Sequence, residues 1–153
     1  MSDFDVSVQL KTEVPDALLP RLEAAAVATL EHEGVAPPAA LSVLLAGDDY
    51  VHRLNRDFRG VDKPTDVLSF PTGDAMPGDE HYLGDVAIAV PVARAQAEAG
   101  GHSLEAELIL LTIHGVLHLL EHDHVGAEEK AAMWAAQAAV LADLGVAVQP
   151  PVE

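Results

Sequence analysis

The 153-residue sequence contains no cysteine and few basic residues. The absence of cysteine excludes disulfide bonds and thiolate metal sites, and it fits a cytoplasmic protein. Eight Lys and Arg residues stand against 25 Asp and Glu, which gives a formal net charge of −17. Taken as a whole, such an acidic surface repels phosphate, membranes and nucleic acid.

The sequence also lacks a long hydrophobic run. Its longest strongly apolar stretch, residues 108–120, is broken by Thr112, His114 and His118 and is too short to span a membrane. The first residues contain no basic segment followed by an apolar run, so no signal peptide is expected. Half of the residues are hydrophobic and 22% are charged, which is typical of a folded globular protein. The length suits one domain over residues 1–153, with a frayed tail at 147–153.

The spacing of apolar and turn-forming residues predicts a mixed fold. Strands are expected at 5–10, 41–46, 67–70 and 83–90, and helices at 18–34, from 47, at 91–99, at 103–120 and at 127–144. This order predicts an α+β fold with one mixed sheet of about four strands, and a central buried helix that carries histidines. Asp16 is the expected N-cap of the first helix, and Met133 and Trp134 are expected core residues.

Positive charge and histidine are each concentrated in one short window. Half of the eight Lys and Arg residues fall within residues 53–63. Half of the eight histidines fall within residues 114–124. These two windows are where we expect the chemistry of this acidic protein.

The histidine window has the spacing of a metal site. His114 and His118 are four residues apart in a predicted buried helix, so both imidazoles lie on one face. Burying an imidazole costs free energy unless its nitrogens have bonding partners, and one zinc ion would be such a partner for both histidines. The helical pattern fades after Leu120, so the chain can turn back and offer His124 as a third ligand, with His122 as a competitor. Three protein nitrogens would leave a fourth position for water, as in catalytic zinc sites.

The spacing H-x3-H-x5-H is also that of the metzincin peptidases. Those enzymes have a glutamate general base directly after the first histidine. In this sequence Gly115 occupies that position, and no Met-turn is visible. A zinc peptidase is therefore an alternative that lacks its base.

Residues 114–124 (HGVLHLLEHDH) resemble the signature H-G-x-L-H-L-x-G-[YH]-D-H of the YbeY family of bacterial endoribonucleases. Residues 54–71 are similar to the family's L-N-x-x-[FY]-R-x-x-D-x-P-T-D-V-L-S-F-P, and residues 83–86 (LGDV) to its L-G-D-[IV] strand. The three segments lie in the family's order, and the resemblance spans about residues 41–143. The sequence departs from the family at Glu121, where glycine is usual. A left-handed backbone there would cost a glutamate about 1–2 kcal/mol.

The resemblance implies a zinc-dependent endoribonuclease that cleaves single-stranded RNA. It implies a role in maturing the 3′ end of the small-subunit ribosomal RNA, and in ribosome assembly and quality control. It also implies that His114, His118 and His124 bind one zinc ion per chain and that Arg59 is the catalytic arginine facing the metal. A guanidinium suits this role because it can hold a phosphodiester through two hydrogen bonds and stabilise developing charge. The implied partners are ribosomal RNA and small-subunit proteins or assembly factors in the cytoplasm, with no membrane and no DNA.

Other polar residues have alternative roles. Candidate RNA contacts, or simply solvated residues, are Arg53, Arg56 and Lys63. Candidates to orient the ligand histidines through hydrogen bonds are Asp66, Asp85 and Asp123; the first two could instead cap turns. The general base stays open between Glu121, Asp85 and a zinc-bound hydroxide, as does the choice between water and the RNA 2′-hydroxyl as nucleophile. A non-catalytic ribosome assembly factor with a structural zinc is the second alternative function.

Overall fold

The computed structural model describes residues 4–63, 65–71, 82–120 and 127–146. Its elements, in chain order, are β1 (Phe4–Leu10), α1 (Leu18–His32), β2 (Ala39–Ala46), α2 (Asp48–Arg59), β3 (Val67–Pro71), β4 (Tyr82–Ala89), α3 (Val90–Gly100), α4 (Leu104–Leu119) and α5 (Ala127–Leu144). This is the predicted order, and the expected bounds agree to within two residues. The expected frayed tail at 147–153 lies outside the described residues.

The four strands form one mixed sheet in the order β1-β2-β4-β3. β1 pairs in parallel with β2, and β2 in parallel with β4, whereas β3 runs antiparallel to β4. The sheet confirms the α+β fold expected from the sequence. Because β4 lies between β2 and β3, the shorter strand β3 is an edge strand.

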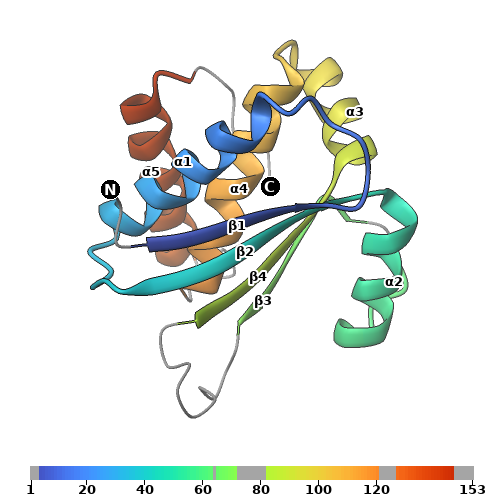
Figure 1. The fold of residues 1–153 in the computed structure, drawn as a ribbon, viewed down its shortest axis with the longest axis horizontal. Coiled ribbons are helices and arrows are strands. Elements are labelled where there is room, and N and C mark those ends of the chain that lie inside the picture. The colour runs from blue at the N-terminus through green and yellow to red at the C-terminus, as the bar shows by residue number, and fades with distance from the viewer. Residues whose placement is uncertain (1–3, 64, 72–81, 121–126, 147–153) are drawn as a thin grey trace.

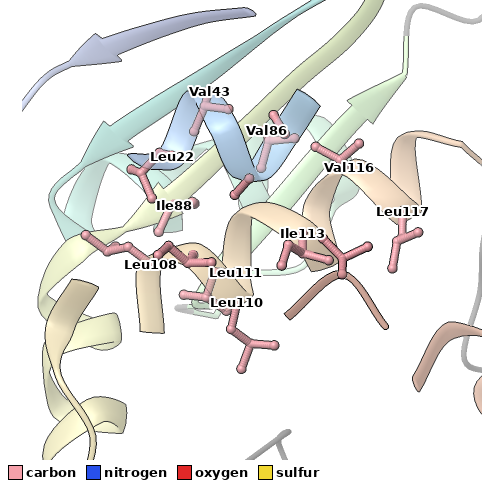
Figure 2. Packing of buried hydrophobic residues seen from close by; sticks show 14 of the residues in the cluster. Leu22, Val43, Val86, Ile88, Leu108, Leu110, Leu111, Ile113, Val116 and Leu117 are labelled. Carbon is pink, nitrogen blue, oxygen red and sulfur yellow. The ribbon is translucent and has the colours of Figure 1, made fainter. Parts of the chain in front are cut away.

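One face of the sheet carries the main core. Along β2 and β4 the inward residues Val43, Val86 and Ile88 are fully buried, while Ser42 and Asp85 point to the opposite face because successive side chains alternate. α1, α4 and α5 lie together over the buried face (Figure 1). Figure 2 shows how side chains of α1, β2, β4 and α4 interdigitate between the sheet and the helices. This core fixes α4 against the sheet.

α4 is the central helix, and most of its side chains are buried. It begins at the N-cap Ser103, whose Oγ accepts a hydrogen bond of 3.1 Å from the Ala106 N–H. The burial of α4 confirms the central buried helix expected from the sequence. Like the other helices of the described residues, α4 is not both long and apolar enough to cross a membrane.

Gly115 lets α4 approach the sheet closely. A Cβ at this position would lie 2.4 Å from Cγ1 of Val86 and 3.3 Å from Cγ2 of Val67. The hydroxyl of Ser69, on β3, donates a hydrogen bond of 2.8 Å to the Gly115 carbonyl. The glycine is therefore required by backbone-to-sheet packing at this point of the helix.

α2 packs on the opposite face of the sheet from α4, near the edge strand. Its small core comprises Ala46, Val51, Leu68 and Ala89. Along β3, Val67 and Ser69 point towards α4, whereas Leu68 points towards α2. Figure 1 shows α2 standing apart from the group formed by α1, α4 and α5. The basic window and the two histidines of α4, His114 and His118, therefore lie on different faces of the sheet.

Two local expectations were wrong. Asp16 is not the N-cap of α1: the cap is Ala17, in a helical conformation and without a side-chain hydrogen bond. Backbone bonds from Leu18 N–H to the Pro15 carbonyl and from Leu19 N–H to the Asp16 carbonyl begin the helix instead. Trp134 is only partly buried, whereas its neighbour Met133 is 1% exposed, because Met133 takes the inward position of this turn of α5.

A buried carboxyl lies where α3 meets α4. Glu107 is 3% exposed, and its Oε1 lies 2.5 Å from Nε2 of His102. Burial raises the pKa of the Glu107 carboxyl, and the hydrogen bond and charge of His102 oppose this only in part. The negative charge of Asp66 raises the same pKa further. Gly100 gives His102 its room, because a Cβ there would lie 2.7 Å from the imidazole Cε1.

Candidate metal centre

His114 and His118 face each other in the second half of α4. Their Nε2 atoms are 3.1 Å apart and their ring centroids 4.7 Å apart. Two nitrogens bound to one tetrahedral zinc ion at about 2.0–2.1 Å lie about 3.3 Å from each other. The two imidazoles thus present their Nε2 atoms at nearly the separation that a shared zinc ion requires.

Gln137 of α5 holds the other nitrogen of His114. Its Oε1 lies 2.5 Å from Nδ1 of His114. An amide oxygen can only accept a hydrogen bond, so Nδ1 carries the proton and Nε2 keeps its lone pair. This is the tautomer that binds a metal through Nε2. The Gln137 side chain is fully buried, and its Nε2 has no hydrogen-bond partner among the described residues.

Trp134 lies one turn before Gln137 on α5 and covers the same histidine. Its ring centroid is 6.4 Å from that of His114, and the two rings are tilted by 44°. The partial burial of Trp134 is explained by this position at the border of the site. α5 therefore supplies both a polar contact and an apolar wall to the candidate metal centre.

The remaining metal-site candidates follow α4 directly. Glu121, His122, Asp123 and His124 all lie outside the described residues, and within the described ranges no group of three or more possible ligands is found. The choice between His122 and His124 as third ligand therefore stays a prediction. The described part of α4 brings together two of the three expected ligands.

Arg59 lies on the other side of the edge strand β3. It is the last residue of α2 and is exposed to solvent. Gly60 follows in the left-handed conformation, with φ at 70°, and ends the helix. Within the described part of the chain Arg59 has no ion-pair partner. Its guanidinium is accordingly available to an external anion.

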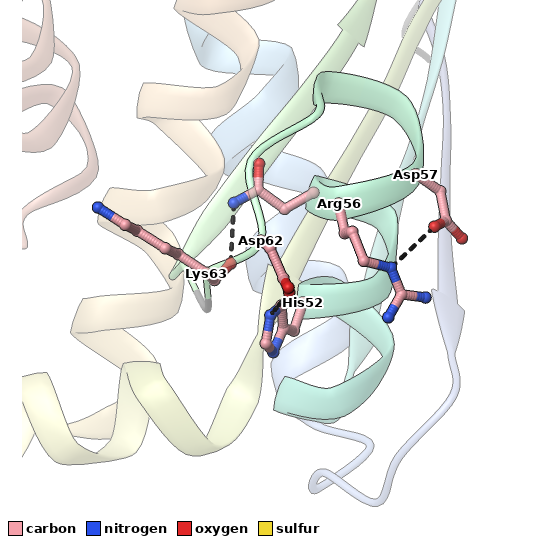
Figure 3. A network of polar contacts seen from close by, with 6 residues as sticks. His52, Arg56, Asp57, Asp62 and Lys63 are labelled. Carbon is pink, nitrogen blue, oxygen red and sulfur yellow. Dashed lines mark hydrogen bonds and ion pairs between the residues drawn. The ribbon is translucent and has the colours of Figure 1, made fainter.

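The other cations of the basic window are exposed as well. The guanidinium of Arg53 lies over the ring of Tyr50, 5.7 Å from its centroid. Nε of Arg56 donates to Oδ1 of Asp57 at 3.0 Å (Figure 3). Lys63 follows α2 in the connection to β3. Within the described residues, Arg56 alone among the three is paired with a carboxylate.

Asp66 and Asp85 have partners of their own. Asp66 accepts hydrogen bonds from the Val67 N–H at 2.8 Å and from Nε2 of Gln96 at 3.3 Å, so it caps the turn that precedes β3. Asp85 bonds to the Tyr82 hydroxyl. Because it alternates with the inward Val86, Asp85 lies on the sheet face that points away from α4.

Two functional candidates were not identified from the sequence. Gln137 follows Met133 by four residues and precedes Val140 by three, so it is a polar residue within the buried stripe of α5. That pattern is the signal that could have revealed it. Phe58 belongs to the apolar stripe of α2, but the structure leaves 71% of it exposed.

The chain was compared with known proteins. The model of the Endoribonuclease YbeY family matches residues 6–145. The chain is 39% identical over 145 residues to Endoribonuclease YbeY of Desulforamulus reducens, covering 92% of this chain and 95% of that protein. It is 44% identical over 144 residues to the protein of the same name from Pelotomaculum thermopropionicum, with the same coverage. The solution structure of TM1509 from Thermotoga maritima superimposes with a TM-score of 0.62 at 26% identity, covering 91% of this chain and 88% of that one.

Proposed function

This chain belongs to the Endoribonuclease YbeY family, and we propose that it is a zinc-dependent enzyme that cleaves phosphodiester bonds in single-stranded RNA. Its proposed substrate is ribosomal RNA, at the 3′ end of the small-subunit species, within ribosome assembly and quality control. Its proposed partners are small-subunit ribosomal proteins or assembly factors, in the cytoplasm. The names of the relatives support the reaction class, and the motif resemblance supports the finer assignment.

One observation carries the proposal: the facing Nε2 atoms of His114 and His118, 3.1 Å apart on one buried helix. These two residues and His124 would hold the zinc ion. When bound, zinc supplies Lewis acidity to a water molecule or to the scissile phosphate. Gln137 keeps the proton of His114 on Nδ1, so the lone pair of the imidazole is on Nε2, which faces His118.

Arg59 is the proposed phosphate-binding residue. Its planar guanidinium can donate two parallel hydrogen bonds to a phosphodiester and can stabilise negative charge that develops during cleavage. Its exposure at the end of α2 and the lack of an ion-pair partner among the described residues support this role. RNA that contacts both Arg59 and the histidines would cross the edge strand β3.

The packing of Gly115 argues against a zinc peptidase. A metzincin carries its glutamate base directly after the first histidine. Here even a Cβ at that position would lie 2.4 Å from Val86. A glutamate side chain at residue 115 would point into the sheet and away from any substrate.

The test is cleavage of matched single-stranded and duplex RNA by the zinc-loaded wild type and by His114→Ala. The single strand should be cut by the wild type, and the variant should lose both the activity and the zinc. His32→Ala is the matched control, because His32 is an exposed histidine at the end of α1, paired with Glu33. Equal activity in His114→Ala and His32→Ala preparations would indicate a contaminating nuclease and overturn the proposal.

Arg59→Ala distinguishes the proposed enzyme from the alternative of a non-catalytic assembly factor. An enzyme should lose RNA cleavage and fail to complement a strain that lacks the gene. If Arg59→Ala complements fully while cleavage is undetectable, the biological role is binding and not catalysis. Zinc content should be measured on the same preparation, because the Arg59 change leaves all proposed ligands in place.

A further inference from the structure

The most exposed large apolar side chain in the described part of the chain is an aromatic ring beside the basic window. Phe58 is 71% exposed, against 39% for both Leu10 and Val61. It continues the stripe that Tyr50 and Leu54 form on α2, one turn beyond the small core on which those two residues pack. Folding therefore leaves most of the apolar surface of this ring in contact with water.

The Phe58 ring is supported on one side and open on the other. Phe70 of β3 contacts it edge to face, with centroids 5.8 Å apart and planes at 73°. Beyond the helix, residues 60–63 are held to α2 by backbone hydrogen bonds and by two side-chain contacts: Asn55 Nδ2 donates to the Lys63 carbonyl at 2.9 Å, and His52 Nε2 lies 2.7 Å from Asp62 Oδ1 (Figure 3). The segment that follows the exposed ring is therefore fixed against α2.

The segment that carries this ring is rich in cations, although the protein has a strong negative charge. Four of the eight Lys and Arg residues lie at positions 53–63, and that window holds only two acidic residues. Both acids have close partners, Asp57 with Arg56 and Asp62 with His52. Arg59 directly follows Phe58 in the chain, and it has no ion-pair partner within the described ranges. An exposed ring among exposed cations is the combination by which proteins bind single-stranded nucleic acid.

We propose that Phe58 is the stacking platform for a base of the single-stranded RNA, next to the phosphate contact of Arg59. The proposal rests on the proposed ribonuclease function and adds a base subsite on the α2 side of β3. The face of an aromatic ring can stack on any base, so such a site would bind single-stranded RNA without reading its sequence. It also requires an unpaired base, since a base stacked within a duplex cannot lie on the ring.

The test compares the binding of two probes by zinc-loaded protein, at low temperature so that cleavage is slow. One probe is an oligouridylate of roughly ten nucleotides, and the other is an abasic ribose-phosphate oligomer of the same length and charge. Phe58→Ala should weaken oligouridylate binding about 5- to 100-fold and leave abasic binding unchanged. Phe58→Trp should restore binding, and Phe58→Leu, which is apolar but has no π face, should not.

Leu10→Ala is the matched control, because Leu10 is an exposed apolar residue at the end of β1, away from the basic window. The inference is overturned if Phe58→Ala binds oligouridylate as the wild type does, or if Phe58→Leu restores binding. It is also overturned if Phe58→Ala weakens the binding of both probes equally, since the loss would then not depend on the base. Absence of RNA cleavage by the wild type would contradict the proposed function. The comparison of the two probes measures binding, so it would still test the stacking site.

Discussion

Oε1 of Gln137 lies 2.5 Å from Nδ1 of His114, although the two residues are 23 positions apart. Gln137 is fully buried in α5, and His114 projects from α4 towards it. Through this contact Gln137, which is not a proposed metal ligand, determines which nitrogen of the imidazole carries the proton.

Gln137→Met should therefore lower zinc affinity about 10- to 100-fold, because the side chain keeps its length but loses its acceptor. Gln137→Glu keeps an acceptor oxygen and should retain affinity. Competition with a fluorescent zinc chelator measures both, independently of RNA cleavage. Wild-type affinity in the Met variant would show that the contact does not support the ligand.

The ligand choice after α4 is the second prediction. His124→Ala should lower zinc affinity by at least about 10- to 100-fold, because His124 has enough chain after Leu120 to return to the pair on α4. His122→Ala should lower it little. Chelator competition on both variants, with one zinc per wild-type chain by elemental analysis, decides the assignment. Zinc release by His122→Ala alone would reverse it and would point to Glu121 as the cause of a different turn.

Gly115→Ala should destabilise the fold by about 1–3 kcal/mol, because the added methyl group collides with the stiff side chain of Val86. Urea unfolding measures the change as a lower midpoint. Gly47→Ser is the control, since a Cβ at Gly47 meets no atom within 4 Å and the hydroxyl can cap α2. Equal midpoints for both variants would show that α4 can move away from the sheet at no cost.

Charge reversal should separate the basic window from the remaining arginines. Changing Arg53, Arg56 and Lys63 to Glu should weaken RNA binding. Changing Arg21, which lies 3.8 Å from Glu105, and the exposed Arg94 of α3 should not. About four phosphate contacts, with Arg59 included, give a shallow salt slope near −3 for single strands. A steeper slope, or equal losses from both sets of variants, would place the RNA elsewhere.

Glu107 makes stability depend on pH in a defined direction. Burial raises the pKa of its carboxyl in the folded state, so the folded protein binds more protons than the unfolded chain between the ordinary pKa and the raised one. The stability that Glu107 contributes is present below the ordinary pKa and is lost as pH rises through the raised pKa. Relative to the wild type, Glu107→Gln should gain stability across that window. Chemical unfolding of both proteins at several pH values tests this, and a difference that shrinks with rising pH would contradict it.

Local patterns in the sequence were enough to predict the elements and to place two candidate metal ligands on one helical face. Period-two and helical spacings gave the strands and helices to within two residues, because each pattern reflects which side of one element is buried. The four-residue separation of His114 and His118 placed both on one helical face, because α-helical geometry alone determines that relation. The caps were less accurate: the sequence predicted Asp16 as the N-cap of α1, but backbone hydrogen bonds begin that helix instead.

Tertiary structure alone decided what surrounds these residues. The strand order put β3 at the edge and separated α2 from α4, and it left Phe58 of α2 exposed to solvent. The packing of α4 on the sheet made Gly115 a steric requirement. The docking of α5 on α4 brought Gln137 to His114. Such contacts join residues far apart in the chain, and they depend on how whole elements pack, which the periodicity of a single segment does not determine.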